Sequence, residues 1–208
     1  MNVYLYIEGG AQGADSKILK IGCQEAFHKL LERMGYRGRQ PRLVACGGRQ
    51  EVYERFCIEH ASRKAAYVAM WIDSEEPVAE FDATWSHLGR VSTVGRWQRP
   101  EATTDDQVLF MATCMETWIV ADRGTLESHY GSHLQQSALP PLDNLERRSR
   151  HDVQERLAHA TRACTNAYEK GKRSYTILGL LNPEVLQEHL PHFARVRRIL
   201  DARLDQAR

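Results

Sequence analysis

The stretch VYLYIEGGAQGADSK, residues 3–17, decides how the rest of the chain is interpreted. It opens with an uninterrupted apolar run, which is typical of a strand covered on both faces. Strands of this kind belong to parallel sheets that have helices above and below them. The run ends in a carboxylate, Glu8, and small residues follow. The stretch therefore predicts a buried first strand with an acid at its carboxyl end.

The glycines after this strand do not match a phosphate-binding loop. The dinucleotide fingerprint G-x-G-x-x-G needs a glycine where this chain has Glu8, whose charge would repel a pyrophosphate. A P-loop needs Gly-Lys-Ser/Thr, whereas Ala14 and Asp15 follow Gly13. We interpret the glycines as residues that let another molecule or a metal approach the strand end closely.

Further apolar runs predict strands at residues 42–46, 65–73 and 108–113. Helices are expected between the first three strands, at residues 16–34 and 50–60. The first helix has apolar residues at the i, i+3, i+4, i+7 spacing of a buried face, namely Phe27, Leu30, Leu31 and Met34. Gly35 is expected to end this helix. This β-α-β-α-β order predicts an α/β fold with a right-handed parallel sheet.

The two halves of the chain differ in character. Residues 74–104 contain prolines and glycines and are expected to have little regular structure. After Pro141 the strand signals stop and arginine-rich helical segments follow, the last beginning at Pro183. We therefore expect an α/β core at residues 1–140 and a C-terminal helical extension, residues 141–208, packed on it.

Composition limits the class of protein. The 208 residues carry a formal net charge of +1, so the overall charge favours no nucleic acid or membrane surface. No apolar run approaches the roughly 18 residues of a membrane span, and the first residues do not resemble a signal peptide. The five cysteines form no C-x-x-C pair, which favours reduced thiols. We expect a cytoplasmic protein without a membrane partner.

Acidic residues stand at the ends of two predicted strands. Glu8 ends the first, Asp73 ends the third, and Glu75 follows two residues later. The carboxyl ends of parallel strands share one edge of the sheet, where ligands bind. Carboxylates that meet there repel each other unless a cation neutralises them, and oxygen ligands suit Mg²⁺ or Mn²⁺. Glu116, which lies in an apolar context, is a fourth candidate ligand.

The order of these motifs resembles the TOPRIM domain of topoisomerases, primases and OLD-type nucleases, in which one strand ends in Glu-Gly and a later strand in Asp-x-Asp or Asp-x-Glu. Here these residues are Glu8-Gly9 and Asp73-Ser74-Glu75, with Glu75 where many TOPRIM domains have a second aspartate. More closely, the chain resembles a bacterial TOPRIM-like family that is known as a domain of unknown function. The matching segments span most of the chain in order: YIEGG, ACGGR, IDSEEP, TTDDQV, CMETWIVAD and YEKGKRSY.

The resemblance implies Mg²⁺-dependent phosphodiester chemistry on DNA or RNA. It also implies an ATPase partner of the ABC or AAA type and a role in defence against phage. OLD-type nucleases use a lysine near the scissile phosphate, which makes Lys170 a catalytic candidate and Lys172 its equal rival. The sequence leaves open whether the chain forms a homo-oligomer.

Each candidate also has an ordinary structural interpretation. Glu8 could cap the helix that follows it, and the acids at residues 73–76 could simply begin a helix, where the dipole favours them. Glu116 could pair with an arginine instead of a metal. The tryptophans are expected in the core, with Trp85 and Trp97 as alternative base-stacking surfaces.

Two basic clusters are candidate phosphate contacts. Arg147, Arg148 and Arg150 would bind nucleic acid if they lie on the side of the active site, and a second cluster contains Arg195, Arg197 and Arg198. Clusters of this kind usually form solvated helix faces.

Taken together, the residues and the resemblance predict a metal-dependent nuclease in which Glu8 and, as the resemblance implies, Lys170 are catalytic. Glu8, Asp73, Glu75 and Glu116 would hold the metal. The alternative is a TOPRIM-like subunit that binds an ATPase or nucleic acid and cleaves nothing.

Overall fold

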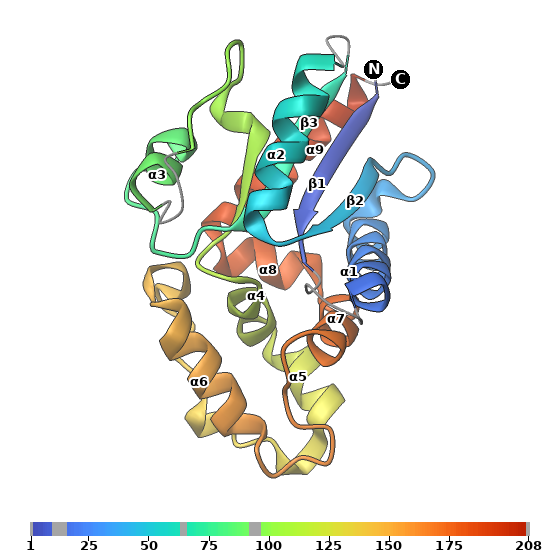
Figure 1. Cartoon of the computed structure of the whole chain (residues 1–208). Coiled ribbons are helices and arrows are strands. Elements are labelled where there is room, and N and C mark those ends of the chain that lie inside the picture. Colours follow the sequence, from blue (N-terminus) through green and yellow to red (C-terminus); the bar gives the residue numbers. More distant parts are fainter. Residues whose placement is uncertain (1, 10–15, 63–65, 92–96, 207–208) are drawn as a thin grey trace.

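In the computed structural model, which describes residues 2–9, 16–62, 66–91 and 97–206, a parallel sheet lies at the centre of the chain (Figure 1). Its strands follow the order β2-β1-β3-β4. Their bounds are β1 Val3–Glu8, β2 Arg42–Gly47, β3 Tyr67–Asp73 and β4 Val108–Met111. The expected α/β fold with a parallel sheet is therefore confirmed.

The two faces of the sheet are covered by different helices. On one face, Leu5 and Trp71 pack against α1, Ser16–Leu31, and α9, Pro191–Asp205. On the other, Tyr6 and Met70 pack against α2, Arg49–Ser62, and α3, Thr84–Val91. Because both faces are buried, β1 and β3 are apolar at every position before their final acid, as the uninterrupted runs predicted.

The connection after β1 and the connection after β3 run in opposite directions along the sheet. From β1 the chain passes through α1 to β2, and from β2 it returns through α2 across β1 to β3. The strand order therefore reverses between β1 and β3. In parallel α/β sheets, such a switch point opens a crevice outside the carboxyl ends of the strands, and ligands bind there.

The helices that follow β4 lie mostly beyond the carboxyl ends of the strands, in the lower half of Figure 1, and α9 returns along the sheet. The bounds are α4 Met115–Ala121, α5 Arg123–Tyr130, α6 Arg150–Thr161, α7 Lys172–Leu178 and α8 Pro183–His189. Shorter helical turns lie at Glu32–Tyr36, Asp105–Gln107, Gly131–His133, Gln136–Ala138 and Leu145–Arg147. Leu157 and Phe193 share one hydrophobic core with Leu5, so the core continues across residue 140. The division of the chain at that residue stays a prediction.

Most predicted helix and strand positions agree with the structure. All four residues of the predicted apolar face are buried, three on α1 and Met34 in the turn that follows it, and Gly35, with a φ of 90°, breaks the helical geometry as expected. The strand expected at residues 65–73 begins at Tyr67, and residue 65 lies outside the described residues.

One prediction was incomplete and another was wrong. The described residues of the excursion at 74–104 have little regular structure, as expected, but they include one short helix, α3, whose Trp85 and Leu88 are buried against the sheet. The final helix is two helices, because Pro191 begins α9 immediately after α8 has ended at His189. A helix of the length and hydropathy that membrane crossing needs is not found among the described residues.

Candidate functional site

Glu8 and Asp73 lie side by side at the switch point. They end the neighbouring strands β1 and β3, and the backbone N–H of Asp73 donates a hydrogen bond to Oε2 of Glu8 at 3.2 Å. The Oδ1 atom of Asp73 accepts a hydrogen bond from the N–H of Met115, the first residue of α4, at 2.9 Å. Backbone amides therefore orient both carboxylates, and the sequence-based expectation that they meet is supported by this geometry.

Glu75 completes a cluster of carboxylates. One oxygen each of Glu8, Asp73 and Glu75 lies within 4.8 Å of the others. The backbone of Glu75 has a φ of 69°, a left-handed conformation that is uncommon outside glycine. Its N–H donates to the carbonyl of Thr113 at 2.9 Å, beyond the end of β4. This turn directs the side chain of Glu75 back toward the strand ends.

Burial raises the pKa of the two central acids, and repulsion by neighbouring carboxylates raises that of Asp73 further. For Asp73 the pKa rises well above its ordinary value, first because of burial and then because of the charges of Glu8 and Glu116. Burial likewise raises the pKa of Glu8, against the nearby positive charges of Arg49 and Lys170. In the folded protein, ionisation of both carboxylates is therefore unfavourable unless a positively charged group lies beside them.

Arg49 supplies one such charge, and the sequence analysis did not name it. It is the first residue of α2 and directly follows two glycines, Gly47 and Gly48. Gly47 has a φ of 100°. Its Nη1 atom donates to the carbonyl oxygen of Asp73 at 2.5 Å and lies 3.9 Å from Oε1 of Glu75. The signal was available, because a cation after the end of β2 reaches the same edge of the sheet as the acids of β1 and β3.

The first basic cluster divides into three environments. Arg150, at the start of α6, forms an ion pair with Glu75, so it lies at the site. Arg148, which precedes α6, pairs with Asp152 in the first turn of that helix at 3.2 Å. Arg147 is exposed. The structure therefore brings one of the three expected phosphate contacts to the carboxylates.

The second basic cluster is not a simple solvated face. Arg195 is 3% exposed, and its guanidinium donates to the carbonyl oxygens of Val108 and Asp105 at 3.1 and 2.9 Å. It therefore fastens α9 to the start of β4. Arg197 pairs with Glu184 of α8 at 2.7 Å, and Arg198 remains exposed.

Glu116 lies behind the cluster and is not part of it. It is fully buried in the first turn of α4, where its Oε1 accepts a hydrogen bond from the hydroxyl of Tyr168. Its Oε2 accepts from the side-chain amide of Gln154 at 3.1 Å. The arginine partner considered for this acid is therefore wrong. Its charge still acts on the site, because it raises the pKa of Asp73.

The two rival lysines are separated. Lys170 is exposed in the loop before α7, and its positive charge lowers the pKa values of Glu8 and Asp73 against the larger effect of burial. Lys172 begins α7 and lines a different groove with Leu19 and Gly22 of α1. The position of Lys170 is the one that fits a role at the carboxylates.

The interpretation of Gly9 changes. A Cβ atom at this position would lie 2.3 Å from Sγ of Cys23 and 3.1 Å from the hydroxyl oxygen of Tyr175. The space beside the glycine is therefore filled by α1 and α7 of this chain, and not kept open for another molecule. Gly10 and Gly13, which entered the same interpretation, lie outside the described residues.

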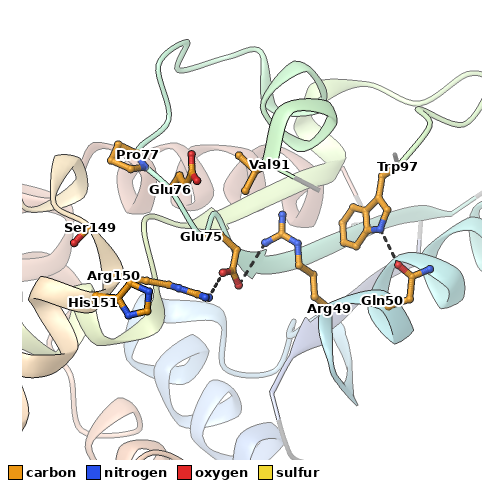
Figure 2. Close-up of a pocket in the computed structure, with 10 residues that line it drawn as sticks. All are labelled: Arg49, Gln50, Glu75, Glu76, Pro77, Val91, Trp97, Ser149, Arg150 and His151. Atoms are coloured by element: carbon orange, nitrogen blue, oxygen red, sulfur yellow. Dashed lines mark hydrogen bonds and ion pairs between the residues drawn. The ribbon is translucent and has the colours of Figure 1, made fainter. Parts of the chain in front are cut away.

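A cavity of about 630 Å³ adjoins the carboxylates (Figure 2). Arg49, Glu75 and Arg150 line it, and the figure shows Glu75 between the two arginines. Trp97 forms part of its wall, with its ring stacked on Tyr53 at a centroid distance of 4.5 Å. Both Trp85 and Trp97 are buried, as expected for core residues.

The comparisons with known proteins identify a family. Neither the curated proteins nor the solved structures give a significant match to the chain. A family model described as Domain of unknown function (DUF4276) matches residues 17–201. This range includes Arg49, Asp73, Glu75 and Lys170 of the site, whereas Glu8 precedes it. The chain belongs to the family of proteins that contain this domain of unknown function.

Proposed function

We propose that the protein is a TOPRIM-like, Mg²⁺-dependent nuclease that hydrolyses nucleic-acid phosphodiesters. One observation carries the proposal: Glu8, Asp73 and Glu75 converge within 4.8 Å at the switch point of a parallel sheet. Glu8 and Asp73 come from adjacent strands, and both have a raised pKa. Titratable groups perturbed in this way gather at functional sites.

The donor set fits a hard divalent cation. It consists of carboxylate oxygens, the ligands that Mg²⁺ and Mn²⁺ prefer, and contains no thiolate or imidazole. Glu8, Asp73 and Glu75 would hold the ion, while Glu116 would act from behind them through its charge. When bound, the cation would polarise a phosphate oxygen and acidify a water molecule.

The side chains of this chain would supply the remaining functions. Glu8, whose pKa is raised by burial, is suited to accept a proton from the attacking water. Lys170, exposed beside the acids, would stabilise the negative charge that develops on the phosphate. Tyr168 and Gln154 fix Glu116 by hydrogen bonds, so its charge stays in place.

The biological setting rests on the resemblance to OLD-type nucleases. We propose that the protein is the effector subunit of an anti-phage system and acts with an ATPase of the ABC or AAA type. The cytoplasm is the compartment in which such a system works, and the five cysteines are free, which is compatible with it.

One observation favours a second candidate, a non-catalytic binding subunit. Glu75 is already neutralised by Arg150 and lies 3.9 Å from Arg49. A site of this kind is partly compensated without any cation. A protein of this type would bind nucleic acid or an ATPase and leave phosphodiesters intact.

A nuclease assay separates the two candidates. Plasmid DNA and total RNA are incubated with the protein and Mg²⁺, Mn²⁺ or a chelator, with and without an ATPase of the ABC or AAA type as the proposed partner. We expect metal-dependent cleavage that Glu8→Gln and Asp73→Asn each reduce by roughly 100-fold or more, since both remove a proposed ligand. Circular dichroism confirms that the variants are folded. Cleavage by folded variants at the parent's rate would overturn the nuclease proposal.

A further inference from the structure

We propose that the cavity beside the carboxylates is a phosphate subsite formed by Arg49 and Arg150, and that Glu75 occupies it until a divalent cation binds. The inference rests on the proposed function and deepens it, since it names the group that the cavity receives. It also predicts that cation and phosphate bind cooperatively.

The first argument is the fixed position of Arg49. Its side chain is 17% exposed, its Nη1 atom is held by the carbonyl oxygen of Asp73, and its guanidinium lies over the ring of Trp97 at 5.0 Å from the centroid. The ring itself is held by a hydrogen bond from its Nε1 to Oε1 of Gln50 at 2.9 Å. A guanidinium held in this way loses little entropy when an anion binds to it.

The second argument is an unused donor. The Nη2 atom of Arg49 is buried and has no hydrogen-bond partner. A buried donor without a partner is costly, and in a native protein it calls for an explanation. An anion that takes the place of Glu75 beside Arg49 would supply the missing acceptor.

The third argument is the position of Glu75 between two sets of partners. Its carboxylate contacts Arg150 and Arg49 on the cavity side, as Figure 2 shows, and also lies within 4.8 Å of the oxygens of Glu8 and Asp73. Its backbone is held by the hydrogen bond to Thr113. A change of partner therefore requires only rotation of the side chain.

Charge balance couples the two events. Three carboxylates, Glu8, Asp73 and Glu75, face three cationic groups, Arg49, Arg150 and Lys170. A divalent cation adds positive charge and draws Glu75 toward Glu8 and Asp73, which leaves both guanidinium groups without their carboxylate. Arginine pairs suit phosphate oxygens, so a phosphate group is the anion that this arrangement selects.

The test measures binding of inorganic phosphate by calorimetry, with Mg²⁺ or with a chelator. For the parent protein we expect phosphate to bind about tenfold more tightly with Mg²⁺, within the usual range for coupled sites. Glu75→Gln, which removes the competing charge, should bind phosphate more tightly than the parent in chelator and should lose most of the Mg²⁺ effect.

Arg150→Gln should weaken phosphate binding by about tenfold, since it removes one charged donor. Its side chain is 37% exposed, so the substitution is compatible with folding. The matched control is Arg162→Gln, because this exposed arginine lies at the opposite end of α6, about 18 Å along the helix. The control should bind phosphate as the parent does.

The outcomes distinguish the inference from the proposed function. If Mg²⁺ binds, but phosphate affinity responds neither to Mg²⁺ nor to Glu75→Gln, the inference is overturned and the cation site stands. If titration with Mg²⁺ detects no binding, the metal site of the proposed nuclease is overturned. Tighter phosphate binding by Glu75→Gln would still support the phosphate subsite. Equal phosphate binding by the Arg150→Gln and Arg162→Gln variants would overturn the subsite.

Discussion

The backbone N–H of Asp73 donates a hydrogen bond to Oε2 of Glu8 at 3.2 Å, so the last residue of β3 holds the last side chain of β1. This contact joins two acids that are 65 positions apart in the sequence. It places two carboxylates together in a half-buried setting, where burial raises the pKa of both and the charges of Glu8 and Glu116 raise that of Asp73 further. The predictions below follow from this pair and the residues around it.

The pH dependence of stability should report on Asp73. Its pKa is raised in the folded state, so the folded protein binds the proton more tightly than the unfolded chain does. This stabilisation is complete below the unfolded pKa of about 3.9 and is lost as the pH rises through the raised folded value. Asp73→Asn removes the titration, so in chelator its advantage over the parent should grow with pH. Urea melts at several pH values measure this, and a constant difference between the two proteins would contradict it.

Divalent cations should stabilise the folded protein. Because the three carboxylates come together only in the fold, Mn²⁺ at about 100 times its dissociation constant should add roughly 2.7 kcal/mol to the free energy of unfolding. Asp73→Asn should abolish this gain. Asp143→Asn, a change of equal charge at an exposed position, is the control and should respond to Mn²⁺ as the parent does. Thermal melts at a series of Mn²⁺ concentrations measure the Tm of each protein. A parent Tm that does not change with Mn²⁺ would contradict a metal site at these carboxylates.

The two lysines should differ in their effect on cleavage. Lys170→Met removes the positive charge that acts on Glu8 and Asp73 and should slow cleavage by roughly 100-fold, as expected for the loss of a transition-state contact. It should also shift the pH dependence of Mn²⁺ binding upward, because the pKa values of both acids would rise further. Lys172→Met, in a separate groove, should change neither property. Similar losses in both variants would remove Lys170 from its proposed role.

Glu116 should affect the metal indirectly. Because its oxygens are engaged by Tyr168 and Gln154, Glu116→Gln should change the affinity for Mn²⁺ by less than about tenfold, whereas Asp73→Asn should change it by roughly 100-fold or more. The substitution removes a repelling charge, so the pKa of Asp73 should fall. Calorimetric titrations with Mn²⁺ compare the variants. Equal losses in both would show that Glu116 is a direct ligand, as the sequence analysis expected.

Gly9 should be intolerant of a side chain for a packing reason. Gly9→Ala places a Cβ atom 2.3 Å from Sγ of Cys23, and we expect it to lower the free energy of unfolding by roughly 1–3 kcal/mol. In combination with Cys23→Ala the added cost should shrink, because the clashing sulfur is gone. Gly48→Ala is the control, since no atom lies within 4 Å of the added methyl group. Urea denaturation of the parent, Gly9→Ala, Cys23→Ala and the double variant gives the interaction free energy, and additive costs would contradict the packing explanation.

The sequence by itself determined the local elements and the acids at their ends. The unbroken apolar runs of β1 and β3 predict doubly covered strands, since a strand buried on both faces has no polar side to show. The carboxyl ends of parallel strands share one edge, so Glu8 and Asp73 could be placed at that edge without coordinates. The helical spacing of apolar residues on α1 was equally informative, because it depends only on the geometry of one helix.

Only the tertiary structure decided which side chains meet at that edge. The strand order β2-β1-β3-β4 places β1 beside β3, and no local pattern encodes this pairing. Arg150 forms an ion pair with Glu75, which is 75 positions away in the sequence. Arg148, only two positions before Arg150, pairs with the nearby Asp152 instead. Arg195, whose neighbours suggested a solvated face, is buried where α9 returns to β4. Periodicity records which face of an element is apolar, whereas the partner of a charged group depends on contacts between elements that are distant in the chain.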